Sequence, residues 1–207
     1  MSRRTLAALV LGLAVAASVA FFALSGRRPD AAAIMTVRPD DVTIGSPDAP
    51  IVVVAYYAFT CTACADFHRT TLPALKQRWI DTGRVLFVYR DLPRGARDLA
   101  VSTLSRCAAG LQKDRYVVWL DLLFARQAEW LRTPEPLSTL FNLARETDFV
   151  GFDRFQLCQG NPATEAAILD SVARAERAGV RAVPAIFVQG RRVAPADLER
   201  ALAVVSG

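Results

Sequence analysis

A Cys-x-x-Cys motif stands where an apolar run meets a helical pattern, and this arrangement constrains the chain more than any other feature. The run 51–59 is apolar, and its residues 51–58 carry no charge and no polar–apolar alternation, so they predict a strand buried on both faces. Cys61 and Cys64 follow and open a helical pattern, with a kink or break expected at Pro73. A helix start makes a thiol acidic and places the second sulfur one turn away. The motif therefore predicts thiol–disulfide exchange, with Cys61 attacking and Cys64 resolving.

The pattern after this helix predicts an α/β fold. A second apolar run, 85–89, completes a strand–helix–strand unit whose strands should be parallel neighbours. Between residues 96 and 178 the apolar residues recur at spacings of three and four, which predicts a series of helices. Strand patterns return at 185–188 and 192–193, before a final helix over 195–205. A long helical stretch thus interrupts the strands.

The amino terminus carries an uncharged apolar segment of 19 residues, 6–24. This length is close to the roughly 20 residues that cross a bilayer, so we expect a transmembrane helix that acts as an uncleaved signal anchor. Small residues near its end also fit a cleaved signal peptide, and that alternative stays open. The residues that follow, rich in proline and alanine, predict a short linker.

The charge of the chain gives no reason to expect a nucleic-acid partner. The net charge is +5, but the four arginines within residues 1–28 account for +4 of it and leave +1 for the rest. Four cysteines, an even number, fit an oxidising compartment better than the cytosol. The residues alone therefore favour an extracytoplasmic location, either anchored through residues 6–24 or released by cleavage. A cytosolic domain on the same anchor would leave Cys107 and Cys158 unexplained.

Three segments together resemble the DsbA-like thiol–disulfide oxidoreductases of the thioredoxin superfamily. They are residues 59–68 around the motif, residues 85–93, and the stretch around Val183-Pro184. The resemblance covers about residues 42–206, nearly the whole part after the apolar segment. It implies that Pro184 is a cis-proline facing the active-site sulfurs. It also implies that the Val183 backbone binds substrate by pairing with an extended chain.

The resemblance implies a thioredoxin-like fold with an inserted helical domain, here preceded by the N-terminal transmembrane helix. The expected divisions are a signal anchor or signal peptide over 1–28, a linker over 29–41, a first thioredoxin-like half over 42–93, the inserted helical domain over 94–178, and a second half over 179–207.

Two positions depart from the pattern of many relatives. Thr62 and Ala63 stand between the cysteines where Pro-His is frequent, and Ala55 stands where a buried glutamate often carries protons. Loss of the histidine donor should raise the pKa of Cys61 relative to such proteins. Because redox poise follows thiolate stabilisation, we expect a milder oxidant.

Cys107 and Cys158 lie on two predicted helices of the inserted region, 51 positions apart. Neither has a Cys-x-x-Cys partner or a helix-start setting, so we expect a structural disulfide rather than a second redox pair. The resemblance agrees, because some DsbA-like proteins carry a second, non-catalytic disulfide.

His68, the only histidine, falls on the helix face of Cys61 and is expected to be half-exposed. Together with Cys61 and Cys64 it offers an alternative, a site for soft copper ions. The chain has only Met1 and Met35 as methionines, and a copper-handling protein would favour more. We therefore expect no metal and no cofactor.

The sequence favours a monomeric extracytoplasmic thiol–disulfide oxidoreductase, and an oxidase over a reductase or isomerase. The resemblance implies the periplasmic side of a bacterial inner membrane as its location, anchored through residues 6–24, or the periplasm in soluble form after cleavage. Its expected partners are exported proteins with cysteines, the inner membrane, and a membrane redox protein of unknown identity that regenerates the motif. The alternatives from another class are a non-catalytic copper-binding protein and a peptide-binding protein that keeps the fold without turnover.

Overall fold

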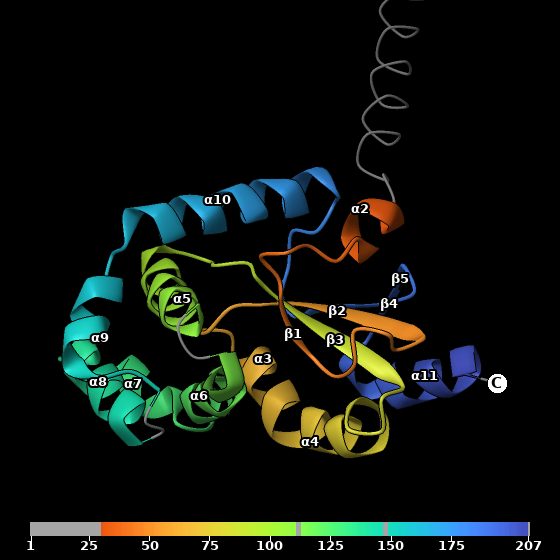
Figure 1. The fold of residues 1–207 in the computed structure, drawn as a ribbon, viewed down its shortest axis with the longest axis horizontal. Helices are drawn as coiled ribbons and strands as arrows, with labels where there is room; N and C mark the ends of the chain where they lie inside the picture. Colours follow the sequence, from red (N-terminus) through yellow and green to blue (C-terminus); the bar gives the residue numbers. More distant parts are fainter. Residues whose placement is uncertain (1–29, 111–112, 147–148, 207) are drawn as a thin grey trace, which may run out of the picture.

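A five-stranded sheet forms the centre of the protein (Figure 1). The computed structural model describes residues 30–110, 113–146 and 149–206. The strand order is β1-β3-β2-β4-β5. The strands are β1 (Val42–Ile44), β2 (Ile51–Tyr57), β3 (Val85–Asp91), β4 (Ala185–Val188) and β5 (Arg191–Val193). β2 and β3 are parallel neighbours, as predicted, whereas the pairs β1–β3, β2–β4 and β4–β5 are antiparallel.

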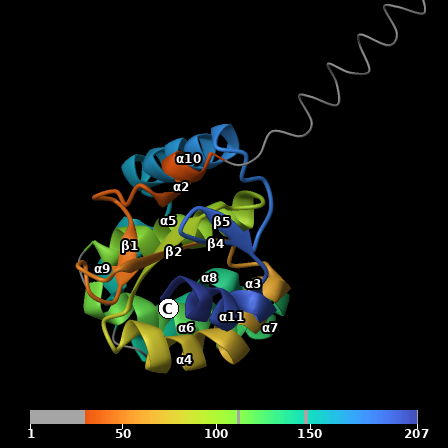
Figure 2. The same ribbon diagram turned by 90° about the vertical axis from the view of Figure 1, so that its right-hand side faces the viewer.

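Both faces of the sheet are covered, because β2 and β3 carry apolar side chains on each side. Val53 and Ala55 of β2 join the hydrophobic cluster on one face, and Val54 and Tyr56 join the cluster on the other. Figure 2 shows α2 (Ala31–Met35) and α10 (Pro162–Arg177) on one side of the sheet. It shows α4 (Leu72–Leu75) and α11 (Leu198–Ser206) on the opposite side. The final helix begins with the 3₁₀ turn η3 (Pro195–Asp197).

The helix after the Cys-x-x-Cys motif alternates between α and π hydrogen bonding. It runs through α3 (Thr62–Asp66), η1 (Phe67–Thr71), α4 and η2 (Lys76–Ile80), of which η1 and η2 are π-helical. Pro73 is the second residue of α4, directly after η1. The missing N–H of proline is tolerated in the first turn of a helical segment. The hydrogen-bonding pattern therefore changes near Pro73 while the chain stays helical.

Six helices lie between β3 and β4 in the described part of the chain, in agreement with the predicted helical insertion. Besides α10 they are α5 (Ala96–Ala109), α6 (Lys113–Ala125), α7 (Gln127–Arg132), α8 (Pro136–Glu146) and α9 (Phe152–Cys158). Their core holds the fully buried Trp119 and Trp130. The indole N–H of each is satisfied, by Ser105 Oγ and by the Leu123 carbonyl. Trp119 also stacks on Phe149, with ring centroids 5.1 Å apart.

A disulfide joins Cys107 of α5 to Cys158, the last residue of α9. The Cα atoms are 5.3 Å apart, although 51 positions separate the two residues in the sequence. Cys158 is fully buried, so the bridge lies within the packing of the inserted helices.

The predicted linker over 29–41 contains more structure than expected. Asp30 accepts the Ala33 N–H and starts α2, whose Ile34 is buried against the sheet. The buried Arg90 side chain of β3 then fixes the segment. It pairs with Asp41 at 2.7 Å and donates to the carbonyls of Ile34 and Thr36. These contacts join residues that are distant in the sequence, and a helix as short as α2 leaves little periodicity to detect. The linker prediction therefore missed α2.

The predicted transmembrane helix over 6–24 lies outside the described residues. Among the residues that are described, no helix combines the length and the apolar character needed to cross a bilayer.

Candidate active site

Cys61 occupies the N-cap of α3, as the motif predicted for a helix start. Its Sγ accepts the backbone N–H of Cys64 at 3.2 Å, while its carbonyl accepts the N–H of Ala65 at 3.1 Å. The side chain thus satisfies one of the amide donors that every helix start leaves without a helical partner. Cys61 is partly exposed, whereas Cys64, one turn on, is buried, and both are free thiols. Only Cys61 is open to attack from outside.

The two thiols of the motif have opposite acidities. The pKa of Cys61 is lowered to about 7, chiefly because the Cys64 thiol hydrogen-bonds to it, and the N–H groups of Cys64 and Ala63 add to this effect against the opposing effect of burial. The pKa of Cys64 is raised, first because of its hydrogen bond with Cys61 and second because of burial. Near pH 7 about half of Cys61 is therefore thiolate, the nucleophilic form. Cys64 stays protonated.

Val183 and Pro184, which the sequence connected with the motif only by resemblance, lie against it. The Val183–Pro184 peptide bond is cis, and the Val183 carbonyl is 3.8 Å from Cys61 Sγ. β4 begins directly afterwards, at Ala185, and pairs with β2, the strand that leads into the motif. The sheet thus brings together two segments that are 122 positions apart in the sequence.

Two residues of the inserted helices hold the loop before Cys61, and the sequence reasoning did not find them. The carboxylate of Asp98 accepts hydrogen bonds from the N–H and the hydroxyl of Thr60, both at 2.7 Å. The amide of Gln127 donates to the carbonyls of Phe59 at 2.7 Å and Cys61 at 3.1 Å. An acidic residue in the first turn of a helix has an ordinary explanation in the helix dipole. Asp98 therefore carries no signal that points to the motif. Gln127, a neutral polar residue of a predicted helix, carries none either.

The expectation that His68 is half-exposed was wrong. Its side chain is buried, stacks on Phe124 with ring centroids 4.2 Å apart, and places Nδ1 3.5 Å from an Asp121 oxygen. Burial lowers the pKa of His68. The expectation used regular α-helical geometry on an open face, whereas His68 lies in the π segment η1, which packs against α6. Within the described part of the chain, no group of three or more acidic, cysteine or histidine side chains could hold a metal ion.

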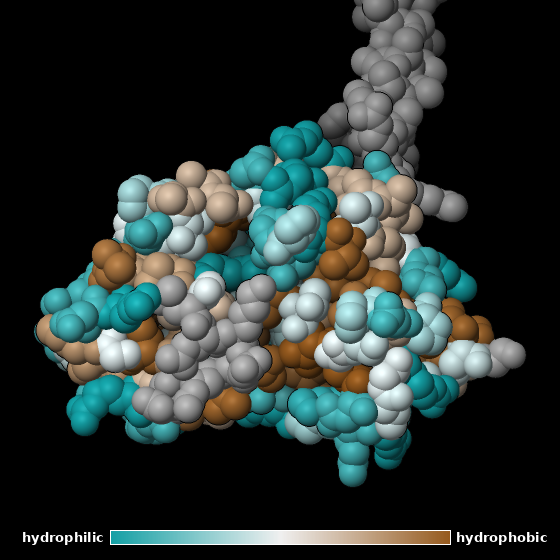
Figure 3. All heavy atoms as spheres, in the orientation of Figure 1, coloured by the Kyte–Doolittle hydropathy of each residue, from teal (hydrophilic) through white to brown (hydrophobic). Residues whose placement is uncertain are grey.

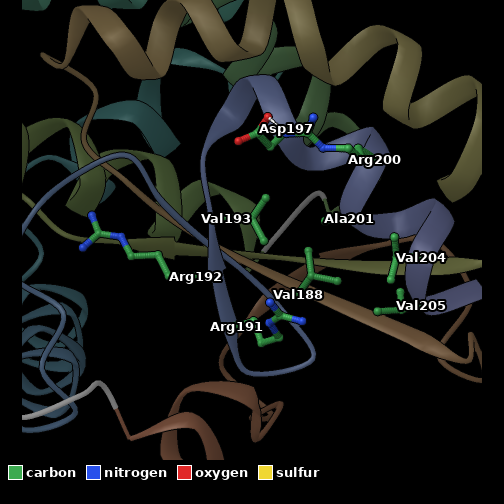
Figure 4. A pocket seen from close by; sticks show the side chains of 9 residues that line it. All are labelled: Val188, Arg191, Arg192, Val193, Asp197, Arg200, Ala201, Val204 and Val205. Carbon is green, nitrogen blue, oxygen red and sulfur yellow. Dashed lines mark hydrogen bonds and ion pairs between the residues drawn. The ribbon is translucent and has the colours of Figure 1, made fainter.

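Two hollows of the surface lie away from the motif cysteines. One, of about 340 Å³, is lined by His68, Asp121 and apolar residues of β1, α4 and α6. Figure 3 shows hydrophobic residues gathered on this face of the molecule, below and beside β1. The other, of about 250 Å³, lies between β5 and α11 (Figure 4). Val188 and Val193 form its apolar floor, and neither hollow includes a cysteine.

Comparisons with known proteins agree with this fold. The family model described as Thioredoxin matches residues 37–206, so the chain belongs to that family. The structure of Wolbachia pipientis alpha-DsbA1 superimposes with a TM-score of 0.72 at 24% identity, over 86% of this chain and 94% of that one. BdbD from Bacillus subtilis, in its oxidised form, also gives 0.72, at 18% identity and over 81% and 94% of the two chains. The predicted thioredoxin-like α/β fold with a helical insertion is confirmed.

Curated relatives match parts of the chain. A "Putative protein-disulfide oxidoreductase" of Rickettsia bellii is 35% identical over 94 residues, which is 45% of this chain and 36% of the relative. A similarly named protein of Rickettsia typhi is 24% identical over 73% of this chain and 55% of its own length. The "Probable disulfide bond formation protein D" of Bacillus cereus is 27% identical, over 74% of this chain and 72% of the relative. The chain thus spans about half or less of the rickettsial relatives.

Proposed function

We propose that the protein is a thiol–disulfide oxidoreductase in which Cys61 attacks or is attacked and Cys64 resolves. The observation that carries the proposal is the N-cap position of Cys61, with its pKa of about 7, beside a buried Cys64. An exposed acidic thiol with a protected partner one turn away is what an exchange cycle requires. The names of the rickettsial and Bacillus relatives support the same activity.

In the oxidised protein the cycle begins when a substrate thiolate attacks Cys61 Sγ. The Cys61–Cys64 bond breaks, a substrate–Cys61 disulfide forms, and Cys64 leaves as a thiolate that takes up a proton, as its raised pKa favours. A second substrate thiolate then attacks the substrate sulfur and releases the Cys61 thiolate. The substrate loses two electrons and forms a disulfide, while the motif gains them and becomes a dithiol.

The direction we favour is oxidation of substrate cysteines. The "disulfide bond formation" name of the Bacillus relatives supports this direction. Thr62 and Ala63 supply no histidine donor between the cysteines, so the oxidant should be a mild one. An extended substrate chain would pair with the Val183 backbone, which together with Pro184 lies beside Cys61.

The place of action in this proposal is the extracytoplasmic side of the membrane. The apolar segment 6–24 supports a signal anchor, or a signal peptide if it is cleaved, and a disulfide between Cys107 and Cys158 fits an oxidising compartment. The substrates would be exported proteins with cysteines, and a membrane redox protein would reoxidise the motif of the monomer. Residues 42–93 and 179–207 form the thioredoxin-like halves around the insertion, 94–178.

The reduction potential of the Cys61–Cys64 pair tests this proposal. It is measured on the full chain in detergent by equilibration with glutathione, with each cysteine followed by alkylation and mass mapping. A potential nearer about −120 mV than about −270 mV supports the oxidase, and one near −270 mV assigns a reductase. A motif that never exchanges disulfides with glutathione would contradict the enzyme proposal as a whole.

A further inference from the structure

We propose that Asp98 is a positioning residue of the inserted helices that fixes Thr60 and that, through its buried negative charge beside the two sulfurs, weakens the Cys61–Cys64 pair as an oxidant. This inference rests on the proposed exchange function and adds a residue to it. Asp98 lies 37 positions after Cys61, in the first turn of α5, the helix that follows β3 in the chain.

The contacts of Asp98 join the insertion to the loop that carries the attacking thiol. Oδ1 accepts the Thr60 N–H at 2.7 Å, and Oδ2 accepts the Thr60 hydroxyl at 2.7 Å and the Arg94 N–H at 3.0 Å. Thr60 immediately precedes Cys61, and Asp98 itself is only 2% exposed. A buried carboxylate with three donors has a fixed position. The residue before the nucleophile is therefore fixed as well.

No ion pair neutralises this carboxylate among the described residues. The two arginines next to it in sequence direct their guanidinium groups elsewhere: Arg94 donates to the Arg181 carbonyl at 2.9 Å and Arg97 to the Leu131 carbonyl at 3.2 Å. The field of a buried charge without a counter-ion extends further than that of a paired one, because little water screens it. The field of Asp98 reaches the sulfurs of Cys61 and Cys64, which follow Thr60 in the chain.

The effect on the sulfurs has a definite sign. The pKa of Cys61 is lowered mainly by the Cys64 thiol, and the charge of Asp98 works in the opposite direction. The pKa of Cys64 is raised mainly by its hydrogen bond with Cys61 and by burial, and Asp98 raises it further. In the described residues Cys64 and Asp98 are the titratable side chains that act on Cys61. A less stable thiolate favours the disulfide, so the carboxylate lowers the oxidising power of the pair.

Two substitutions in the full chain separate charge from position. Asp98→Asn removes the charge and keeps the side-chain size; its amide oxygen still accepts the Thr60 N–H and its NH2 group donates to the Thr60 hydroxyl, while the Arg94 N–H loses its acceptor. Thr60→Val keeps the charge of Asp98 and removes only the hydroxyl hydrogen bond. Both variants are equilibrated with glutathione, in which two glutathione thiols reduce the Cys61–Cys64 disulfide to two thiols and leave one glutathione disulfide. The alkylation rate of reduced Cys61 is followed against pH.

Asp98→Asn should shift half-maximal alkylation of Cys61 to lower pH by about one pH unit. Reduction by glutathione should then become about fivefold more favourable at pH 7, which is about 20 mV for a two-electron couple. Thr60→Val should shift both quantities much less. If Asp98→Asn does not fold, Asp98→Ser, which also removes the charge, carries the same expectation.

Three results would overturn the inference. The first is an unchanged alkylation profile and glutathione equilibrium in Asp98→Asn. The second is a shift of Cys61 alkylation to higher pH in that variant. The third is an equal shift in Thr60→Val, because the effect would then come from the loop alone. In each of these cases exchange with glutathione continues, whereas failure of the proposed function means that the unsubstituted protein does not exchange at all.

Discussion

The two cysteine pairs of this protein differ in their position on the helices, in their separation along the chain and in their bonding state. Cys61 and Cys64 lie one turn apart at a helix start, with one sulfur partly exposed and both thiols free. Cys107 and Cys158 come from two helices of the insertion and form a bridge with a buried member. The difference teaches that the surroundings, and not the residue type, assign the role. A helix start favours exchange, whereas a bridge that closes a long loop between two packed helices favours stability.

The largest expected effect comes from removing the attacking sulfur of the exchanging pair, and it falls on the rate of disulfide exchange. Cys61→Ser removes the attacking sulfur, so the rate at which the protein oxidises a reduced dithiol peptide should fall by about three orders of magnitude or more. The measurement follows the peptide by mass spectrometry with oxidised glutathione as terminal oxidant. The matched control, Cys107→Ser with Cys158→Ser, should keep the rate at a temperature where it is folded. Equal losses in both variants would remove the distinction between the pairs.

The second effect concerns stability, and here the Cys107–Cys158 pair should matter more than the Cys61–Cys64 pair. Loss of the Cys107–Cys158 bridge should cost about 4 kcal/mol in the chain-entropy treatment of a loop of 51 residues. For a domain of this size that loss corresponds to a fall in melting temperature of about 8–16 °C. Thermal unfolding of the double serine variant measures it. A melting temperature equal to that of the parent protein would show that the bridge does not stabilise the fold.

A third, smaller effect tests whether the insertion supports the exchanging pair. Gln127→Leu removes the side-chain donor to the Phe59 and Cys61 carbonyls, of which the Cys61 carbonyl keeps the Ala65 N–H, and this loss should cost about 1–3 kcal/mol of unfolding free energy. Urea unfolding measures the change. Gln156→Leu is the matched control, because Gln156 is exposed in α9 and its loss should stay within about 0.5 kcal/mol. Similar costs for the two variants would argue against a supporting role.

The fourth effect is the pH profile of the reduced motif. Because the pKa of Cys61 is lowered to about 7, its alkylation by iodoacetamide should rise with pH and be half-maximal near pH 7. At pH 7 its thiolate fraction should exceed that of an ordinary cysteine, with a pKa of about 8.5, by about tenfold or more. Cys64 should not react over the same range, since its pKa is raised. A half-maximal rate near pH 8.5 would show that neither the Cys64 thiol nor the amides at the helix start lower the pKa of Cys61.

The sequence predicted the parts of the fold that depend on local pattern. The charge-free run before the motif, the parallel partner strand and the helical stretch all follow from periodicity, and Cys61 at a helix start follows from the motif. Val183 and Pro184 were connected to the motif only through family resemblance, because 122 positions separate them from Cys61. Local pattern carries no information on such a separation.

The residues that sequence reasoning missed act through tertiary contacts. Asp98 and Gln127 meet the active-site loop only after the insertion has packed against it. His68 is buried because it lies in the π segment η1, which packs against α6. Regular helical spacing alone predicts neither the π segment nor this packing. The helix α2 depends on packing against the sheet and on the long-range contacts of Arg90. In each case the deciding partner lies more than 20 positions away.

The central claim is that the two pairs respond differently to the same redox buffer. Mass mapping of all four cysteines, in full-length folded protein equilibrated across a series of glutathione ratios, tests it most directly. The account predicts that Cys61–Cys64 passes from disulfide to dithiol within the series while Cys107–Cys158 stays bridged throughout. Reduction of Cys107–Cys158 at the same glutathione ratio, or a Cys61–Cys64 pair that does not respond to the buffer, would contradict it.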